Sequence, residues 1–220
     1  MNAALNVIRE ISPIFEENTY LVYDLASRVA ALVDPGYPLE AIDAFIARES
    51  LSVRDIVLTH GHVDHISGVG YYRKKYGATV WLSADERDVV EQTKRDYERQ
   101  VPELSDFAVD RTFEDGESVG ALGFRVVAAP GHTKGSAILE LPGLAFTGDT
   151  LFEGSVGRTD LYSGDEESLK ASLRRFMAET DDDVVIAPGH GSATRVGRER
   201  QANPYVLAWT KGERWNPSED

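Results

Sequence analysis

Short apolar stretches rich in β-branched residues recur along the chain, and they predict strands. Each stretch is a few residues long and is bounded by polar, proline or glycine positions, as strands in globular proteins usually are. The predicted strands cover residues 5–11, 19–24, 29–34, 53–58, 79–82, 124–128, 137–141, 144–146 and 184–187.

Segments with helical spacing lie between these strands. Ser83 and Ser163 each precede a glutamate by three residues, a spacing that predicts a capping box at a helix start. After the second of these starts, Leu169, Leu173 and Phe176 share one helical face. The predicted helices are 38–47, 65–76, one beginning at 83–86 and one beginning at 163–166. Strands and helices therefore alternate in each half of the chain, which predicts a fold of the mixed α and β classes.

Chain length, composition and net charge restrict the number of domains and the classes of partner that we expect. The 220 residues carry 23 Lys+Arg against 37 Asp+Glu, a net charge of −14, and no low-complexity linker divides them. We therefore expect a single domain over residues 1–220, with a short polar tail after about Trp209. An acidic chain disfavours a nucleic-acid partner, and without an apolar run of about 18 residues no membrane span is expected. A cytoplasmic protein with a small-molecule partner is the resulting expectation, and the sequence does not indicate an oligomeric state.

A cluster of histidines and aspartate follows the predicted strand 53–58. Residues 59–65 read Thr-His-Gly-His-Val-Asp-His, and the chain contains no cysteine. Any metal must therefore be held by imidazole and carboxylate groups. His60 and His62 lie two residues apart in an extended loop and can bind the same ion. Asp64 and His65 begin the next helix and face a neighbouring position. One loop can in this way serve two metal ions.

Three further candidate ligands stand directly after other predicted strands. Ala-Pro-Gly-His occurs twice, ending at His132 and at His190, which suggests two halves built alike. Asp149 follows the strand at 144–146. Seven ligands, with one bridging carboxylate, fill two four-coordinate sites. We expect two divalent ions, with zinc favoured and iron or manganese as alternatives.

Five segments of this chain together resemble the metallo-β-lactamase superfamily, in its glyoxalase II-like (hydroxyacylglutathione hydrolase-like) branch. They are 59–65, Pro-Gly-His-Thr at 130–133 with Gly-Ser at 135–136, Gly-Asp-Thr-Leu-Phe at 148–152, Gly-Arg-Thr-Asp at 157–160, and Pro-Gly-His-Gly at 188–191. The resemblance implies an α+β fold, a four-layer αββα sandwich of two mixed sheets with helices outside. It further implies ligand sets of His60, His62 and His132 for the first metal and Asp64, His65 and His190 for the second, with Asp149 as the bridge.

The chain departs from the longer members of that branch at positions that concern the substrate. Only 30 residues follow His190, so we expect no separate C-terminal helical domain for glutathione binding. Arg158 is retained in the loop after the bridging aspartate, but Asp160 stands where those enzymes carry an aromatic residue. The chain is more similar to short, single-domain bacterial members. Arg158 is the candidate substrate contact, with an ion pair to Asp160 or Asp165 as the alternative.

The predicted activity is hydrolysis of a small thioester by a metal-bound hydroxide. A divalent ion lowers the pKa of its bound water to about 7 and stabilises an oxyanion, and a thiolate leaves without obligatory protonation. Asp64 and Asp149 are the candidate catalytic carboxylates. The alternative is a non-haem iron persulfide dioxygenase of the same superfamily, which shares the segment 157–160 but usually has Gly-Cys where this chain has Gly154-Ser155. Lactonase, β-lactamase and nuclease activities and a purely structural metal site rank below both.

Overall fold

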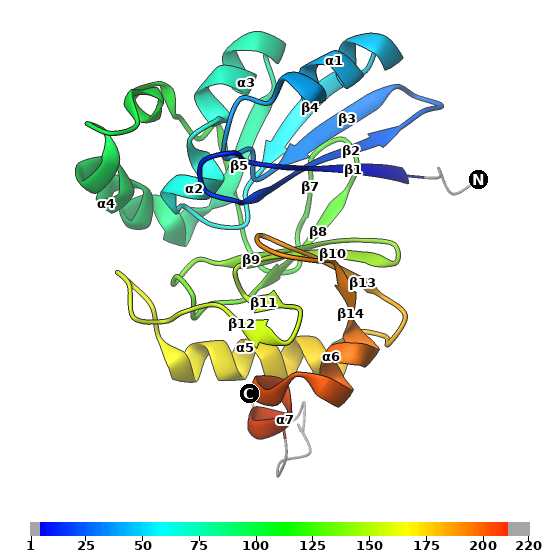
Figure 1. Ribbon diagram of the computed structural model, residues 1–220, viewed down its shortest axis with the longest axis vertical. Helices are drawn as coiled ribbons and strands as arrows, with labels where there is room; N and C mark the ends of the chain where they lie inside the picture. The colour runs from blue at the N-terminus through cyan, green and yellow to red at the C-terminus, as the bar shows by residue number, and fades with distance from the viewer. Residues whose placement is uncertain (1–4, 211–220) are drawn as a thin grey trace.

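Two six-stranded mixed sheets lie face to face, with helices on their outer sides (Figure 1). The computed structural model of the protein describes residues 5–210, apart from the side chains of Glu103 and Ser105. The first sheet has the order β1 (Leu5–Ile11), β2 (Asn18–Asp24), β3 (Val29–Val33), β4 (Ser52–Val57), β5 (Thr79–Ser83) and β6 (Arg111–Phe113). The second has the order β14 (Thr194–Arg195), β13 (Val185–Pro188), β10 (Leu144–Gly148), β9 (Ala137–Leu141), β8 (Phe124–Ala128) and β7 (Ser118–Val119).

The helices divide between the two outer faces (Figure 1). On the side of the first sheet lie α1 (Glu40–Glu49), α2 (Val63–Ile66), α3 (Val69–Tyr76) and α4 (Arg87–Tyr97). On the side of the second sheet lie α5 (Glu166–Glu179), α6 (Val196–Ala202) and α7 (Pro204–Thr210). Short 3₁₀ turns at Ala84–Glu86 and Pro102–Asp106, and a hairpin of β11 (Leu151–Phe152) and β12 (Ser155–Val156), complete the described elements. None of the described helices is long and apolar enough to cross a bilayer.

Alternation along the strands explains why four layers form. In β2, Leu21 and Tyr23 pack in the core between the first sheet and its helices, whereas Tyr20 and Val22 pack against the other sheet. Successive side chains of a strand point to opposite faces, so an apolar run must be covered on both sides. A third apolar core joins the second sheet to α5 and α6. The predicted αββα architecture is therefore confirmed.

The nine predicted strands are all present, with shifts of one or two residues at some ends. The elements missed by the sequence interpretation are β6, β7, β11, β12 and β14, each two or three residues long, together with α6 and α7. Such short strands carry too few residues for alternation to be recognised. Trp209 lies in α7 and is packed against the core of the second sheet, and the predicted tail after it falls at residues 211–220, outside the described part.

The prediction of one helix over 65–76 was wrong. The segment forms α2 and α3, separated at Gly68, whose amide donates to the carbonyl oxygen of Pro35 at 2.9 Å. A Cβ atom on Gly68 would lie 2.5 Å from that same oxygen. The close approach of the Pro35 backbone interrupts the helix, and it requires glycine at this position.

The two predicted capping boxes were also wrong in detail. Asp165, rather than Ser163, caps α5, because its carboxylate accepts from the Ser168 amide at 2.7 Å. Ser83 does cap the 3₁₀ turn before α4, but the Glu86 side chain is buried and turns away from it. A capping box needs a glutamate that folds back to the amide of the capping residue, whereas the Glu86 carboxylate accepts from Gly61, Thr133 and Gly135 instead.

Candidate metal centre

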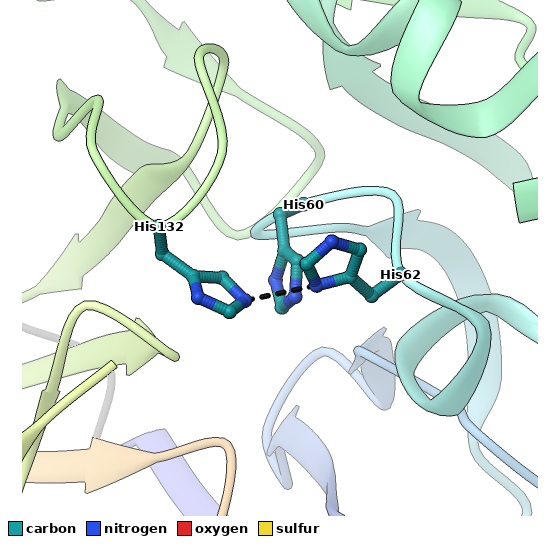
Figure 2. Close-up of side chains that lie close together, drawn as sticks. All are labelled: His60, His62 and His132. Atoms are coloured by element: carbon teal, nitrogen blue, oxygen red, sulfur yellow. Dashed lines mark hydrogen bonds between the residues drawn. The ribbon is translucent and has the colours of Figure 1, made fainter. Parts of the chain in front are cut away.

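Three histidines meet in a first group of candidate ligands. His60 and His62 come from the loop after β4, and His132 comes from the loop after β8 (Figure 2). Their facing ring nitrogens lie within 4.8 Å of one another, and His62 Nδ1 is 2.9 Å from His132 Nε2. Two nitrogen ligands of a tetrahedral zinc ion lie about 3.3 Å apart. The spacing of this group therefore suits a shared ion.

A second group lies beside the first and combines two histidines with two carboxylates. Asp64 and His65 lie in α2, Asp149 follows β10 and His190 follows β13. Their ligand atoms also lie within 4.8 Å of one another. His190 Nε2 is 3.1 Å from Asp64 Oδ2, and His65 Nε2 is 3.8 Å from the same oxygen. The structure thus brings together all seven predicted ligands.

Asp149 lies between the two groups. Its Oδ1 is 3.3 Å from His65 Nε2, while its Oδ2 is 3.6 Å from His132 Nε2 and 3.8 Å from His190 Nε2. One carboxylate therefore faces nitrogens of both groups, which is the arrangement a bridging ligand requires.

Unpartnered polar atoms show that this cluster fits metal ions. Nε2 of His60, Nε2 of His65 and Oδ1 of Asp149 are buried, and none of the three has a hydrogen-bond partner among the described residues. Buried polar atoms are nearly always hydrogen-bonded, and leaving one unpaired costs about 1–3 kcal/mol. Coordination of divalent ions would satisfy all three atoms. The His and Asp clusters are accordingly consistent with a binuclear metal site.

Asp34 orients two of the rings, although it lies outside the seven predicted ligands. Its Oδ2 accepts from His65 Nδ1 at 3.0 Å and from the Thr59 hydroxyl at 2.6 Å. Because the Thr59 hydroxyl donates to Asp34, it accepts from His60 Nδ1, which is 3.1 Å away. In the neutral form of both rings the proton therefore sits on Nδ1, and the Nε2 lone pair faces the centre.

Backbone carbonyl oxygens bind Nδ1 of two further histidine rings and so orient Nε2 of each ring toward the centre. His132 Nδ1 donates to the carbonyl oxygen of Arg158 at 2.8 Å, and His190 Nδ1 donates to that of Glu16 at 3.3 Å. A carbonyl oxygen can only accept, so the Nε2 atoms are again the ones that face the other candidate ligands. Four of the five histidines thus offer Nε2, and His62 offers Nδ1.

The two groups differ in their affinity for protons. In the first group, burial and the neighbouring His65 and His132 rings hold the pKa of His60 well below its usual value. Burial and His132 likewise lower the pKa of His62 to about 4. These rings are neutral at neutral pH, which is the form that binds a metal.

In the second group, the carboxylates together outweigh burial in their effect on the pKa values of the two histidines. Burial by itself would lower the pKa of His65, but Asp64 and Asp149 raise it well above its usual value. The pKa of His190 is raised in the same way, against burial, by its hydrogen bond to Asp64 and by Asp149. A proton on either ring competes with a metal ion, so an ion entering this group displaces protons.

Arg158 forms an exposed ion pair with Asp160, in which Nε and Nη2 lie 2.6 and 2.9 Å from the two carboxylate oxygens. The alternative partner, Asp165, caps α5 instead. Through its backbone oxygen Arg158 also adjoins His132. The Arg158 backbone is thus fixed beside the first group, and the role of its side chain as a substrate contact stays a prediction.

Sequence reasoning missed two residues that hold the centre in place. Asp34 directly follows β3 and precedes Pro-Gly, so it stands just after a strand end, as His132 and His190 do. The Asn18 side-chain amide donates to the carbonyl oxygens of Pro188 and Gly191, on either side of His190. Nothing in the local sequence around Asn18 marks that contact.

The repeated Ala-Pro-Gly-His does not relate the two halves of the molecule. Its copies follow β8 and β13, which belong to the same sheet. The expectation of halves built alike has no support from this repeat. The shared tetrapeptide marks two equivalent strand ends within the second sheet.

Known proteins are similar to this chain in sequence and in architecture. The chain is 35% identical over 206 residues to the hydroxyacylglutathione hydrolase GloC of Haemophilus influenzae, with 90% of this chain and 97% of that protein covered. A crystal structure of TTHA1623 in a di-iron-bound form has a TM-score of 0.79 and 30% identity, covering 90% of this chain and 99% of the other. The crystal structure of the B3 metallo-beta-lactamase BLEG-1 also has a TM-score of 0.79 and 30% identity, covering 91% and 99%.

The match to a family extends over most of the chain and includes all seven candidate ligands. A family model described as the metallo-beta-lactamase superfamily matches residues 13–190, from the β1–β2 connection through His190. The αββα layers and the two adjoining ligand groups agree with that match. The chain belongs to the metallo-beta-lactamase superfamily.

Proposed function

We propose that this protein is a metal-dependent hydrolase that cleaves a small acyl thioester. The main support is the convergence of five histidines and two aspartates in two adjoining groups, three of whose buried atoms lack a hydrogen-bond partner within residues 5–210. The similarity to a hydroxyacylglutathione hydrolase across nearly the full length of both chains favours a thioester among the possible substrates.

The candidate ligands would hold two divalent ions in the arrangement set out above, with zinc favoured. Bound ions of this kind supply a Lewis acid and an activated water at neutral pH. His60, His62 and His132 would hold one ion, and Asp64, His65 and His190 the other, with Asp149 between them. The di-iron form of a similar structure makes iron the main alternative metal.

The chain's own residues contribute rigid positioning. Asp34 and the carbonyl oxygens of Arg158 and Glu16 fix which nitrogen faces the centre in four of the five rings. Groups held in this way need little reorganisation when charge develops during the reaction. A thiolate leaving group has a pKa near 8.5 and does not require a proton donor, so a site built of ligands alone suits a thioester better than an amide.

Thiol release under nitrogen tests the proposed reaction. We expect zinc-loaded protein to release thiol from a small acyl thioester without oxygen, and to lose that activity when a chelator removes the metal. Hydrolysis changes no oxidation state, whereas persulfide oxidation consumes O₂ and needs Fe(II). The same preparation is therefore assayed with iron, glutathione persulfide and an oxygen electrode, and with a chromogenic β-lactam. Rapid O₂ uptake with iron, together with negligible thioester cleavage by either metal, would assign the protein to the dioxygenases instead.

Arg158 is proposed to favour substrates that carry an anionic group. Its pairing with Asp160 is exposed, and such pairs contribute little, so a substrate carboxylate can replace Asp160. We expect Arg158→Ala to raise KM for an anionic thioester about 2- to 5-fold and to leave a neutral thioester unaffected. Asp160→Asn is the matched control, because it frees Arg158 and should lower KM for the same anionic substrate. Equal effects of Arg158→Ala on both substrates would exclude this role.

A further inference from the structure

Glu86 is a fully buried carboxylate that belongs to neither ligand group. It ends the 3₁₀ turn Ala84–Glu86 ahead of α4, and its relative exposure is 0%. Ionised side chains are seldom buried unless several hydrogen bonds compensate for the lost water. Its surroundings therefore indicate what it does.

Three donors from two separate loops point at this carboxylate. The Gly61 amide donates to Oε2 at 2.7 Å, while the Thr133 hydroxyl and the Gly135 amide donate to Oε1 at 2.6 and 2.8 Å. Gly61 stands between His60 and His62, and Thr133 directly follows His132. Glu86 thus joins the two loops that supply the whole first ligand group.

The backbones of both loops lie close to the turn and helix that carry Glu86. A Cβ atom on Gly61 would lie 2.8 Å from Val90 Cγ2, and one on Gly135 would lie 2.8 Å from the Glu86 nitrogen. In addition, the Thr93 hydroxyl of α4 donates to the Gly61 carbonyl oxygen at 2.8 Å. Both loops therefore pack directly against the 3₁₀ turn that contains Glu86 and against α4.

We propose that Glu86 is a positioning residue for the first ligand group: its carboxylate ties the loop of His60 and His62 to the loop of His132, so that the three rings meet at one ion. This inference rests on the proposed metal centre. The second group is held by other residues, Asp34 at His65 and Asn18 beside His190. Loss of the Glu86 carboxylate should therefore affect the two groups unequally.

A carboxylate is needed here because all three partners are donors. An ionised carboxylate only accepts, whereas glutamine presents an NH₂ group to one of the three donors. Glu86→Gln keeps the size of the side chain and removes at least one of the hydrogen bonds. Outer contacts of this type change metal affinity by about 10- to 100-fold.

Metal affinity in two single-site backgrounds tests the inference. In His190→Ala protein, whose second group is disabled, we expect Glu86→Gln to raise the dissociation constant for zinc about 10- to 100-fold. In His62→Ala protein, whose first group is disabled, the same substitution should leave the constant unchanged. In metal-free protein, hydrogen exchange at the Gly61 and Gly135 amides should accelerate, a readout that depends on no bound metal.

Glu199→Gln is the matched control for a general loss of stability. Glu199 is also a buried glutamate, at 2% exposure, and it accepts from the Gly154 amide and the Thr194 hydroxyl at 2.8 and 2.6 Å. The Glu199→Gln substitution should lower the melting temperature of the protein without changing zinc affinity in either background. Equal weakening of both groups by Glu86→Gln, no weakening at all, or a first-group loss with Glu199→Gln would overturn the inference.

Thr133→Val provides a second test if Glu86→Gln protein does not fold. It removes one of the three donors and keeps the shape of the side chain, so first-group affinity should fall while second-group affinity is unchanged. An unchanged first-group affinity would overturn the inference. Failure of the unmodified chain to bind any ion would instead overturn the proposed function, so the two failures are distinguishable.

Discussion

Asp149→Asn should reduce thioester cleavage by about 10³-fold or more and lower the zinc content from two ions to at most one per chain. The reason is the position of this carboxylate, whose two oxygens lie 3.3 Å from His65 Nε2 and 3.6 Å from His132 Nε2. An amide keeps the shape but has lost the negative charge and one of the two acceptor oxygens that a bridge needs. Elemental analysis and thiol-release kinetics on the same sample measure both effects.

Asp160→Asn serves as the control for loss of one acidic charge in this part of the chain. Asp160 pairs with Arg158 at an exposed position and belongs to neither ligand group, so its replacement should leave the zinc content at the value of the unmodified protein. If Asp149→Asn retained two ions, Asp149 would not bridge the groups. If it lost both ions and unfolded, the carboxylate would be essential to the fold as well.

Gly189→Ala should reduce activity by about 100-fold or more, chiefly by disturbing the second ligand group. A Cβ atom at this position would lie 2.3 Å from Asp149 Oδ1 and 2.6 Å from His65 Cε1, which is closer than atoms can approach. The added methyl group must push the carboxylate or the ring away from the centre. Zinc titration should show the weaker affinity in the second group, together with the fall in thioester cleavage.

Gly143→Ala separates this steric effect from a general cost of replacing glycine. Gly143 has a positive φ of 76°, and a Cβ atom there would meet nothing within 4 Å. The substitution should cost about 1–2 kcal/mol of stability through backbone strain while leaving activity and zinc affinity intact. Similar activity losses in both variants would show that Gly189 matters only for folding.

The strands were predictable from sequence wherever both of their faces are buried. In β2 and β10 nearly every residue is buried and the central residues are mostly apolar or small, because a helix layer or a second sheet covers each side. The short strands β6 and β14 could not be predicted, since two or three residues show no alternation and their pairing is set by distant partners. The break at Gly68 was missed for a related reason, as the carbonyl oxygen that causes it belongs to Pro35 on another loop.

The candidate ligands were predictable because their chemistry is local. His60, His62, Asp64 and His65 lie within six residues of one another, and the absence of cysteine leaves only imidazole and carboxylate as metal ligands. The buried glutamate at position 86 was misread as a helix cap, since the spacing that defines a capping box says nothing about which donors lie nearby in space. Its partners, Gly61 and Gly135, are 25 and 49 residues away.

By itself, the sequence determined the types of groups available and the strand ends at which they stand, because periodicity and adjacency are properties of the chain. Only the tertiary structure decided which of these groups meet. His62 and His132 are 70 residues apart and approach to 2.9 Å because β4 and β8, in different sheets, end on the same side of the sandwich. In four of the five rings, the nitrogen that faces the centre was likewise decided by distant acceptors such as Asp34, since a histidine tautomer follows the hydrogen bond made by its other nitrogen.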